Sequence, residues 1–169
     1  MLNISNVNNS VLIALTVLAS FMLLPVNIAH TVEGSTNPSI KMFSFNLSSQ
    51  KWQNRVLLVF APSVDNRNYQ QQMKLFDQHQ NGFTDRDLVL VQVLATGKSY
   101  ANGLPIDEPS AANLRNRFGI DKENFRVILV GKDGGVKRQD STPVQATAIF
   151  DQIDAMPMRQ QEMHERGRK

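Results

Sequence analysis

Ser63 lies where a nucleophile can sit, directly after a strand and before a helix. The apolar run from Val56 to Ala61 predicts a buried strand, and helical spacing begins a few residues after Ser63. A side chain at such a turn lies near the amino end of the helix, where the helix dipole lowers the pKa of a thiol. The sequence contains no cysteine. It is therefore predicted to be neither a thiol-disulfide oxidoreductase nor a thiol peroxidase.

A serine nucleophile needs a general base, and the histidines are not placed to supply one. His30 lies in an apolar leader, His79 lies late in a predicted helix, and His164 lies in a charged tail. None is close to a predicted strand end. Ser63 is therefore predicted to be a turn residue, and no catalytic residue is assigned.

Neither a metal nor a cofactor is predicted. Residue types that bind metals come close together in two places, Asp77 with His79 and Glu162 with His164 and Glu165. Neither group has the spacing of an enclosed site. The segment 131–137 is glycine-rich and basic, but it joins two predicted strands, whereas a phosphate-binding loop precedes a helix. We interpret this segment as a hairpin turn with solvated lysines.

Four charged residues flank the predicted strands: Arg55, Arg86, Asp87 and Lys132. Together with Ser63 they are the candidates for ligand binding. A second interpretation keeps them structural, because a buried Arg55 paired with Asp87 across adjacent strands would be an internal ion pair. Both interpretations stay open at the level of sequence.

Trp52 is the only tryptophan in the sequence. A buried Trp52 would cover one end of the core, whereas an exposed one would be suited to anchor a binding partner. The segment 159–169 mixes basic and acidic residues. It is predicted to be a frayed, charged tail with weak affinity for anionic surfaces at most.

The first 32 residues contain no Lys, Arg, Asp or Glu. Apolar residues run almost unbroken from Val11 to Leu24, a length that is short for a membrane span and typical of a signal peptide. Extended through Ala29, the run reaches the length of a marginal anchor. Segment 1–32 is therefore predicted to be a signal peptide or an N-terminal membrane anchor. The protein is expected to be periplasmic or secreted, with membrane association possible through this segment.

The charge pattern of the sequence indicates which classes of binding partner to expect. The 169 residues carry a formal net charge of +3, and basic residues alternate with acidic ones along most of the folded part. The sequence has no concentrated basic helix and no aromatic-basic sheet motif, so nucleic acid is not expected as a partner. The expected partner is an envelope protein or a small ligand.

A linker and one domain follow the leader. Segment 33–44 is rich in Ser, Thr, Asn, Gly and Pro and is predicted to be the linker. The domain is expected at 45–158, a length usual for a single domain. Its first predicted elements are the strand 56–61 and a helix that Asp65 or Asn66 caps.

The Asn-Gly pair at 81–82 is expected to end this first helix. A second strand at 88–94 then makes a parallel pair with the first, because a helix joins the two. Segment 95–109 is predicted to be a loop. Ser110 is expected to cap a short helix that Gly119 closes.

The C-terminal half predicts a hairpin and a last helix. The strands are 127–130 and 136–138, and Thr142 and Pro143 are expected to open a helix that Pro157 ends. The resulting order is β-α-β-α-β-β-α. This is the order of a thioredoxin-like α/β domain, with a mixed central sheet flanked by helices.

Five ordered segments carry a family resemblance: KWQNRVLLVFAPS, DRDLVLVQV, LRNRFGI, FRVILVGKDGGVKRQ and IDAMPMRQQEM. They span about Phe45 to Glu162 and resemble the family called domain of unknown function 4174, a thioredoxin-like or peroxiredoxin-like group in exported bacterial proteins. Similar domains form parts of secreted animal sushi-repeat-containing proteins. The resemblance implies a fold and an export route, but no activity. Thioredoxins also place a cis-proline before their third strand, and segment 118–130 contains no proline.

These observations favour a non-redox binding or accessory module in the cell envelope. The alternative is an enzyme of non-thiol chemistry that uses a polar pocket near Ser63, Arg55 and Lys132. A concave pocket with convergent polar side chains at the strand ends would favour the enzyme. An exposed apolar or charged patch would favour the binding module.

Overall fold

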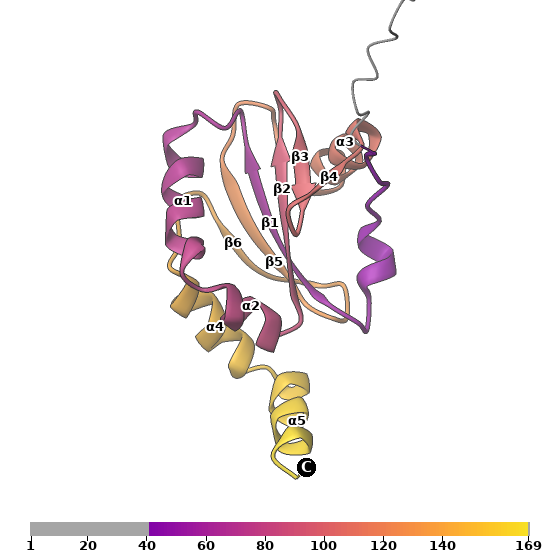
Figure 1. Ribbon diagram of the computed structural model, residues 1–169, viewed down its shortest axis with the longest axis vertical. Coiled ribbons are helices and arrows are strands. Elements are labelled where there is room, and N and C mark those ends of the chain that lie inside the picture. The colour runs from indigo at the N-terminus through magenta and orange to yellow at the C-terminus, as the bar shows by residue number, and fades with distance from the viewer. Residues whose placement is uncertain (1–40, 169) are drawn as a thin grey trace, which may run out of the picture. The chain divides into compact units, whose positions relative to one another are not determined.

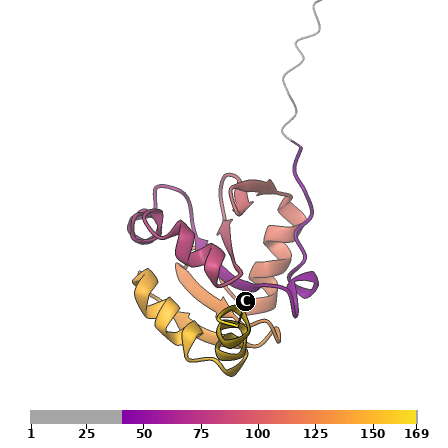
Figure 2. The same ribbon diagram turned by 60° about the horizontal axis from the view of Figure 1, so that its bottom comes forward.

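The structure, a computed structural model, describes residues 41–168 and has a six-stranded sheet with helices on both faces (Figure 1, Figure 2). The strands are β1 (Arg55–Ala61), β2 (Leu88–Leu94), β3 (Ser99–Ala101), β4 (Leu104–Ile106), β5 (Arg126–Val130) and β6 (Val136–Asp140). The helices are the 3-10 turn η1 (Leu47–Gln50), α1 (Arg67–Asp77), α2 (Gln80–Asp85), α3 (Glu108–Phe118), α4 (Ala146–Asp154) and α5 (Pro157–Arg166).

The strand order is β4-β3-β2-β1-β5-β6. β1 pairs with β2 in parallel and with β5 antiparallel, and β6 runs antiparallel to β5. The parallel pair is possible because α1 and α2 carry the chain back to the starting edge of the sheet. The predicted mixed sheet, flanked by helices, is therefore confirmed.

Alternate residues of β1 fill two apolar cores, because successive side chains of a strand point to opposite faces. Leu57 and Val59 pack with side chains of α1, α2 and α4, whereas Leu58 and Phe60 pack with η1 and α3. Figure 1 shows the two groups of helices on opposite sides of the sheet. Every residue of β1 is buried, because β1 lies in the middle of the sheet with helices on both faces.

The first helical region is interrupted. α1 ends at Asp77 and α2 starts at Gln80, so the helix end predicted at Asn81 and Gly82 is wrong. Gly82 lies inside α2, where a Cβ atom would stand 2.5 Å from the ring of Phe150 in α4. The glycine therefore permits close packing of two helices and does not serve as a stop.

Segment 95–109, expected to be a loop, contains a hairpin. β3 pairs with β2 and β4 pairs with β3, so the hairpin extends the sheet beyond β2. Asn102 and Gly103 form the turn with positive φ angles of 45° and 79°. Strands of three residues are too short to show a recognisable alternation in sequence.

The helix caps agree only in part with the predictions. Asn66, one of two expected caps, accepts a hydrogen bond from the Tyr69 amide and starts α1. Gly119 ends α3 in the left-handed conformation, as predicted. Asp107 caps α3 in place of Ser110, because its carboxylate accepts a hydrogen bond from the Ser110 amide at 2.9 Å.

The C-terminal part differs most from the predictions. The β5-β6 hairpin is confirmed, with Gly134 at φ 80° in its turn. α4, however, starts at Ala146 rather than at Thr142 and Pro143. Pro157 does not end the last helix but begins α5, at a position where its missing N–H removes no helical hydrogen bond. α5 therefore replaces most of the expected frayed tail.

The predicted leader at 1–32 lies outside the described residues, as does most of the predicted linker at 33–44. Within residues 41–168, no helix has both the length and the apolar character needed to cross a membrane.

Candidate functional site

Arg55, the first residue of β1, has only 1% of its surface exposed. Its two terminal nitrogens donate to the two carboxylate oxygens of Glu162 at 3.1 Å, and one of them also donates to the Arg86 carbonyl. The planar guanidinium matches the geometry of a carboxylate, which makes the contact strong and directional. Arg55 is therefore in a buried ion pair, as the structural interpretation supposed, but its carboxylate partner is Glu162 of α5 and not Asp87, which pairs with Lys132.

Lys132 follows β5 and lies between two acids. Its Nζ is 2.9 Å from the carboxylate of Asp87 and 2.8 Å from that of Glu162. Glu162 thus forms ion pairs with two cations next to strand ends, Arg55 and Lys132. The contact joins α5 to both the start of β1 and the end of β5.

Arg159 of α5 makes the reciprocal contact with acids of the domain. It is 3% exposed and donates to Asp154 at 3.1 Å and to Asp85. Arg86 pairs with the same Asp154, and its guanidinium stacks 4.4 Å above the Phe150 ring. α5 therefore contributes one acid, Glu162, that pairs with cations of the domain, and one cation, Arg159, that pairs with acids of the domain.

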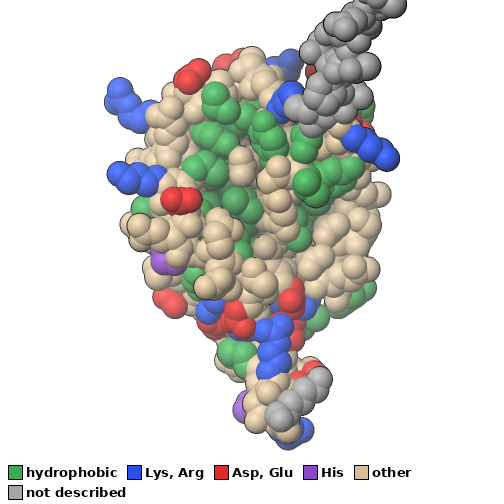
Figure 3. All heavy atoms as spheres, viewed as in Figure 1, with side chains coloured by type: hydrophobic (Ala, Val, Ile, Leu, Met, Phe, Trp, Pro, Cys, Tyr) green, Lys and Arg blue, Asp and Glu red, His purple; other side chains and the backbone are tan. Residues whose placement is uncertain are grey.

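These contacts connect nine residues, which we call the ionic cluster: Arg55, Asp85, Arg86, Asp87, Lys132, Asp154, Arg159, Glu162 and Arg166. In Figure 3 acidic and basic side chains lie side by side where α5 joins the rest of the domain. The buried residue of α5 is Arg159. α5 is therefore held mainly by charge.

The structure brings together four of the five residues predicted from sequence, namely Arg55, Arg86, Asp87 and Lys132. Ser63 is not among them. It follows the carboxyl end of β1, whereas Arg55 stands at the amino end. The Ser63 hydroxyl accepts a hydrogen bond from the Asp65 amide at 3.2 Å, as expected of a turn residue.

Sequence reasoning missed the other five members of the ionic cluster: Asp85, Asp154, Arg159, Glu162 and Arg166. One signal was present in the sequence. Arg159, Glu162 and Arg166 recur at i, i+3 and i+7, a spacing that places them on one face of a helix. Most of their partners, such as Asp85 for Arg159 and Arg55 for Glu162, lie too far away along the chain for any local pattern to indicate them.

The electrostatics of the ionic cluster favour the ionised form of two of its acids, Glu162 and Asp154. Burial opposes the ionisation of Glu162, but hydrogen bonds and charge from Arg55 and Lys132 outweigh it and lower the Glu162 pKa. The pKa of Asp154 is lowered in the same way by Arg86 and Arg159, again against the effect of burial. Carboxylates of this kind are poor proton donors near neutral pH. The ionic cluster is therefore suited to fasten a helix rather than to transfer protons.

Arg115 of α3 occupies the opposite end of the sheet, and it is 7% exposed. It donates to the backbone carbonyls of Ala61 at 2.6 Å, Val93 at 2.9 Å and Asp121 at 3.2 Å. Burial lowers the Arg115 pKa, and the charge of Glu123 partly opposes that change. The carboxyl ends of β1 and β2, next to the Ser63 turn, are thus filled by a guanidinium.

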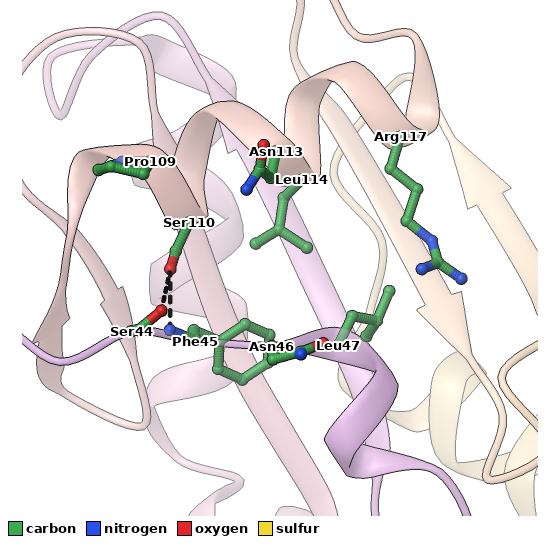
Figure 4. Close-up of a pocket in the computed structure, with 9 residues that line it drawn as sticks. All are labelled: Ser44, Phe45, Asn46, Leu47, Pro109, Ser110, Asn113, Leu114 and Arg117. Carbon is green, nitrogen blue, oxygen red and sulfur yellow. Dashed lines mark hydrogen bonds between the residues drawn. The ribbon is translucent and has the colours of Figure 1, made fainter.

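Two surface hollows lie elsewhere on the domain, and the larger of them is lined in part by Asp87 of the ionic cluster. The first, of about 230 Å³, lies between α3 and the segment before η1 (Figure 4). Ser110 faces this hollow, and its hydroxyl accepts a hydrogen bond from the Phe45 amide at 2.9 Å. The second, of about 540 Å³, follows β2 between α2 and the β3-β4 hairpin. Ser110 therefore ties the incoming chain to α3.

Trp52 lies beside the ionic cluster, in the turn before β1. Its amide donates to the Lys132 carbonyl at 2.7 Å, and its side chain is 68% exposed. Its φ of 65° is a left-handed conformation that bulky residues rarely adopt. Of the two sequence interpretations, the exposed Trp52 is the one observed.

Comparison with known proteins identifies the family. Residues 46–162 match the family model described as Domain of unknown function (DUF4174). The chain belongs to this family. The resemblance found in the five sequence segments is therefore confirmed, and the matched range includes Arg55, Lys132 and Glu162.

Relatives share the domain within much longer proteins. Zebrafish (Danio rerio) coiled-coil domain-containing protein 80 is 30% identical over 69% of this chain and 15% of its own length. Human sushi repeat-containing protein SRPX is 30% identical over 64% of this chain and 24% of its own length. The chain thus spans a quarter or less of these relatives.

A solved structure shows the fold. The reduced 2-Cys peroxiredoxin of Plasmodium vivax aligns with a TM-score of 0.54 and 13% identity, covering 69% of this chain and 85% of that one. The domain is therefore thioredoxin-like, as the order of elements predicted. The likeness extends to the fold alone, and this chain contains no cysteine.

Proposed function

We propose that this protein is a non-redox accessory module of the cell envelope that binds a partner and catalyses no reaction of its own. The observation that carries the proposal is the state of the carboxyl end of β1. Arg115 fills the space there with three hydrogen bonds to carbonyls. Ser63 bonds only to its own turn, and no thiol exists in the sequence.

The geometry argues against the alternative enzyme, which would combine Ser63 with Arg55 and Lys132. β1 separates Ser63 from the other two residues, and a strand of seven residues is about 23 Å long. A nucleophile and its stabilising cations must lie within hydrogen-bond reach of one substrate. Glu162, the acid that Arg55 and Lys132 share, moreover has a pKa lowered by its hydrogen bonds and charge interactions with these two cations, and so is held ionised.

Trp52 is the side chain best suited to contact a partner. Large aromatic residues dominate the binding energy of many protein interfaces. A strained backbone conformation persists only where surrounding structure holds it, and here the bond to Lys132 does so. The envelope location rests on the charge-free leader and on the export route that the family resemblance implies.

Photo-crosslinking in cells tests this proposal. A photoreactive phenylalanine analogue replaces Trp52 in the full chain, and a matched variant carries it at Leu104, which is 62% exposed on β4. We expect a discrete crosslinked species from position 52 and none from position 104. Identical adducts from both positions, or none from either, would contradict a partner at Trp52.

A further inference from the structure

The outer edge of β2 is paired over only part of its length. β3 pairs with β2 at Val91 and Gln92, and the chain then turns back at Asn102. Asn102 occupies the place opposite Leu90, where its amide donates to the Leu90 carbonyl at 2.8 Å and its side-chain oxygen accepts from the Leu90 amide at 2.9 Å. β3 therefore ends before it reaches Leu88, the first residue of β2.

The backbone of Leu88 is directed at this unpaired edge. Backbone groups of successive strand residues point alternately to the two neighbouring strands. The Asp87 carbonyl accepts a hydrogen bond from the Arg55 amide of β1. Leu88, like Leu90, therefore directs its N–H and C=O away from β1, and within residues 41–168 neither group has a hydrogen-bond partner. Leu88 is only 5% exposed, and buried backbone groups are rarely left unpaired.

A hollow of about 540 Å³ adjoins Leu88 between α2 and the β3-β4 hairpin. We call it the β2 groove. Its apolar lining includes Phe83 of α2, together with Leu88 and Leu90, whose side chains point to the face of the sheet that α2 covers. Apolar side chains of a ligand can therefore be buried here, beside the unpaired backbone groups.

The polar lining of the β2 groove is almost entirely uncharged. It consists of four side-chain amides and one hydroxyl, from Asn54, Gln80, Gln92, Asn102 and Thr84. Asp87 is the one ionisable residue among the described residues that line the groove, and its carboxylate is 2.9 Å from Lys132 Nζ. The groove thus complements a ligand that carries hydrogen-bonding groups and no net charge.

An extended peptide backbone matches these features. In an antiparallel pair, the N–H and C=O of one strand residue can both bond to a single residue of the neighbouring strand. Peptides bind to free sheet edges in this way, with alternate side chains entering adjacent pockets. A saccharide also carries uncharged hydrogen-bonding groups, but it does not reproduce the donor and acceptor spacing of a strand. The unpaired N–H and C=O of Leu88 therefore favour a peptide.

We infer that the β2 groove binds an extended, uncharged segment of a partner protein. The segment adds a short strand opposite Leu88, and its alternate side chains lie against Leu90 and Phe83. The inference deepens the proposed binding function and rests on it. Leu88 and Trp52 are at the same end of the sheet, because Leu88 pairs with Arg55 and Trp52 precedes Arg55 by three residues. A single partner is therefore assigned to both.

Titration of the full chain, followed by amide chemical shifts, tests the site with three probes. The first is the blocked peptide acetyl-Thr-Val-Thr-Val-Thr-amide, the second is the same peptide with every backbone N–H replaced by N-methyl, and the third is maltotriose. We expect saturable shifts at Leu88, Val89 and Asn102 with the first peptide. The N-methylated peptide should bind about tenfold more weakly or worse, because it cannot donate to the Leu88 carbonyl.

A first pair of variants examines the polar lining. Asn102→Asp retains an oxygen that can accept from the Leu90 amide and tolerates the positive φ, but it replaces the amide donor of the groove by a charge. It should weaken binding of the peptide about fivefold or more. Asn81→Asp, on exposed α2 surface outside the groove, adds the same charge and should leave binding unchanged.

A second pair of variants blocks the groove itself and decides the question if Asn102→Asp does not fold. Thr84 is an exposed residue of α2 that lines the groove, so Thr84→Trp should reduce binding of the peptide about tenfold or more by filling the space. Gln71→Trp places the same side chain on exposed α1 surface outside the groove and should bind the peptide like the unmodified protein.

The inference is overturned if the first peptide does not saturate at Leu88, if the N-methylated peptide binds as tightly, or if the groove variants that fold bind like the unmodified protein. Saturable shifts at Leu88 with maltotriose but not with the peptide would overturn it in favour of a saccharide. Shifts at Leu88 that depend on protein concentration, with no probe present, would assign the edge to a second copy of the chain and overturn it as well.

Crosslinking at position 52 is scored separately. Loss of the crosslinked species with intact peptide binding would remove Trp52 as the contact and keep the β2 groove, and the opposite result would remove the groove and keep Trp52. Position 104 remains a valid control, because Leu104 pairs with Ala101, whose side chain packs on the face of the sheet opposite to the groove.

Discussion

Glu162 and Arg55 are 107 positions apart in the sequence and form a two-point ion pair that joins the last helix to the central strand. Arg55 is buried, and the side chain of Glu162 is 19% exposed. The pair is therefore mostly shielded from water, and screening by salt should weaken it less than a surface pair. α5 is thus a part of the folded domain and not an appendage.

Replacement Glu162→Gln should lower the free energy of unfolding by roughly 2 to 4 kcal/mol, because it leaves the Arg55 guanidinium buried without a counter-charge. Urea denaturation followed by circular dichroism measures the change. Glu165→Gln, on the exposed side of α5, is the matched control and should stay within about 0.5 kcal/mol of the unmodified protein. A loss below about 0.5 kcal/mol in Glu162→Gln would show that the ion pairs of Glu162 add nothing measurable to stability.

Stability should fall in acid, and the ionic cluster should contribute to the fall. Glu162 and Asp154 have folded-state pKa values lowered below their unfolded values. Their contribution is therefore fully present above the unfolded pKa values of about 4.3 and 3.9, and it is lost as the pH drops through the lower, folded-state pKa values.

Melting temperatures between about pH 2.5 and pH 7 check this expectation. The curve for Glu162→Gln should be flatter below about pH 4.5 than that of the unmodified protein. It should not become flat, because Asp133 has a pKa lowered by its hydrogen bonds with Lys137 and Gly135. Parallel curves for the two proteins would contradict the role assigned to Glu162.

The central strands were predictable because their information is local. The run from Val56 to Ala61 is apolar throughout, as a strand buried on both faces requires. Positions such as Gly119 and Gly134 were predictable for the same reason, since a turn that needs a positive φ selects glycine on the spot. The four charged residues next to strand ends were also found from sequence, because strand ends can be located.

The rest of the site depends on contacts between distant parts of the chain. Arg159 lies in a segment rich in charge, which favours solvent exposure by composition. Its burial depends on Asp85, 74 positions earlier, and on Asp154 across the α4-α5 link. No local pattern indicates such partners. Gly82 was misread for the same reason, since its neighbour Phe150 is 68 positions away.

Replacement Gly82→Ala should therefore destabilise the domain even though alanine favours helices. The added methyl group would stand 2.5 Å from the Phe150 ring, so α2 and α4 must separate, at a cost of about 1 to 3 kcal/mol. Thermal unfolding measures this loss. Gly167→Ala, where the nearest atom would be 3.5 Å away, is the control and should change little. Stabilisation by Gly82→Ala would show that the ring moves freely.

The purified protein should show no thiol-type turnover. With any reductant, it should neither reduce insulin disulfides nor consume peroxide beyond the slow oxidation of its seven methionines. Insulin turbidity and peroxide concentration are compared with a buffer control and with a protein of equal methionine content. Peroxide consumption that continues past the methionine equivalents would contradict the proposed non-redox function.

Cysteine substitutions should show where the amino end of the first helix is directed. The cap of α1 is Asn66, whose side chain accepts a hydrogen bond from the Tyr69 amide at 3.1 Å, and Ser63 stands three residues before it. The helix dipole acts only within the first turn, so the thiol of Asn66→Cys should titrate about one unit or more below the unperturbed value of about 8.5. The thiol of Ser63→Cys should titrate near that unperturbed value, because its closest hydrogen-bond donor is the Asp65 amide of the turn.

Thiolate absorbance measured against pH gives both values, and Asn66→Ser, which retains a capping oxygen, controls for damage to the helix. A lower pKa in Ser63→Cys than in Asn66→Cys would mean that the helix end is directed at Ser63. In that case the carboxyl end of β1 would still hold the electrostatics of a reaction centre, despite the guanidinium of Arg115.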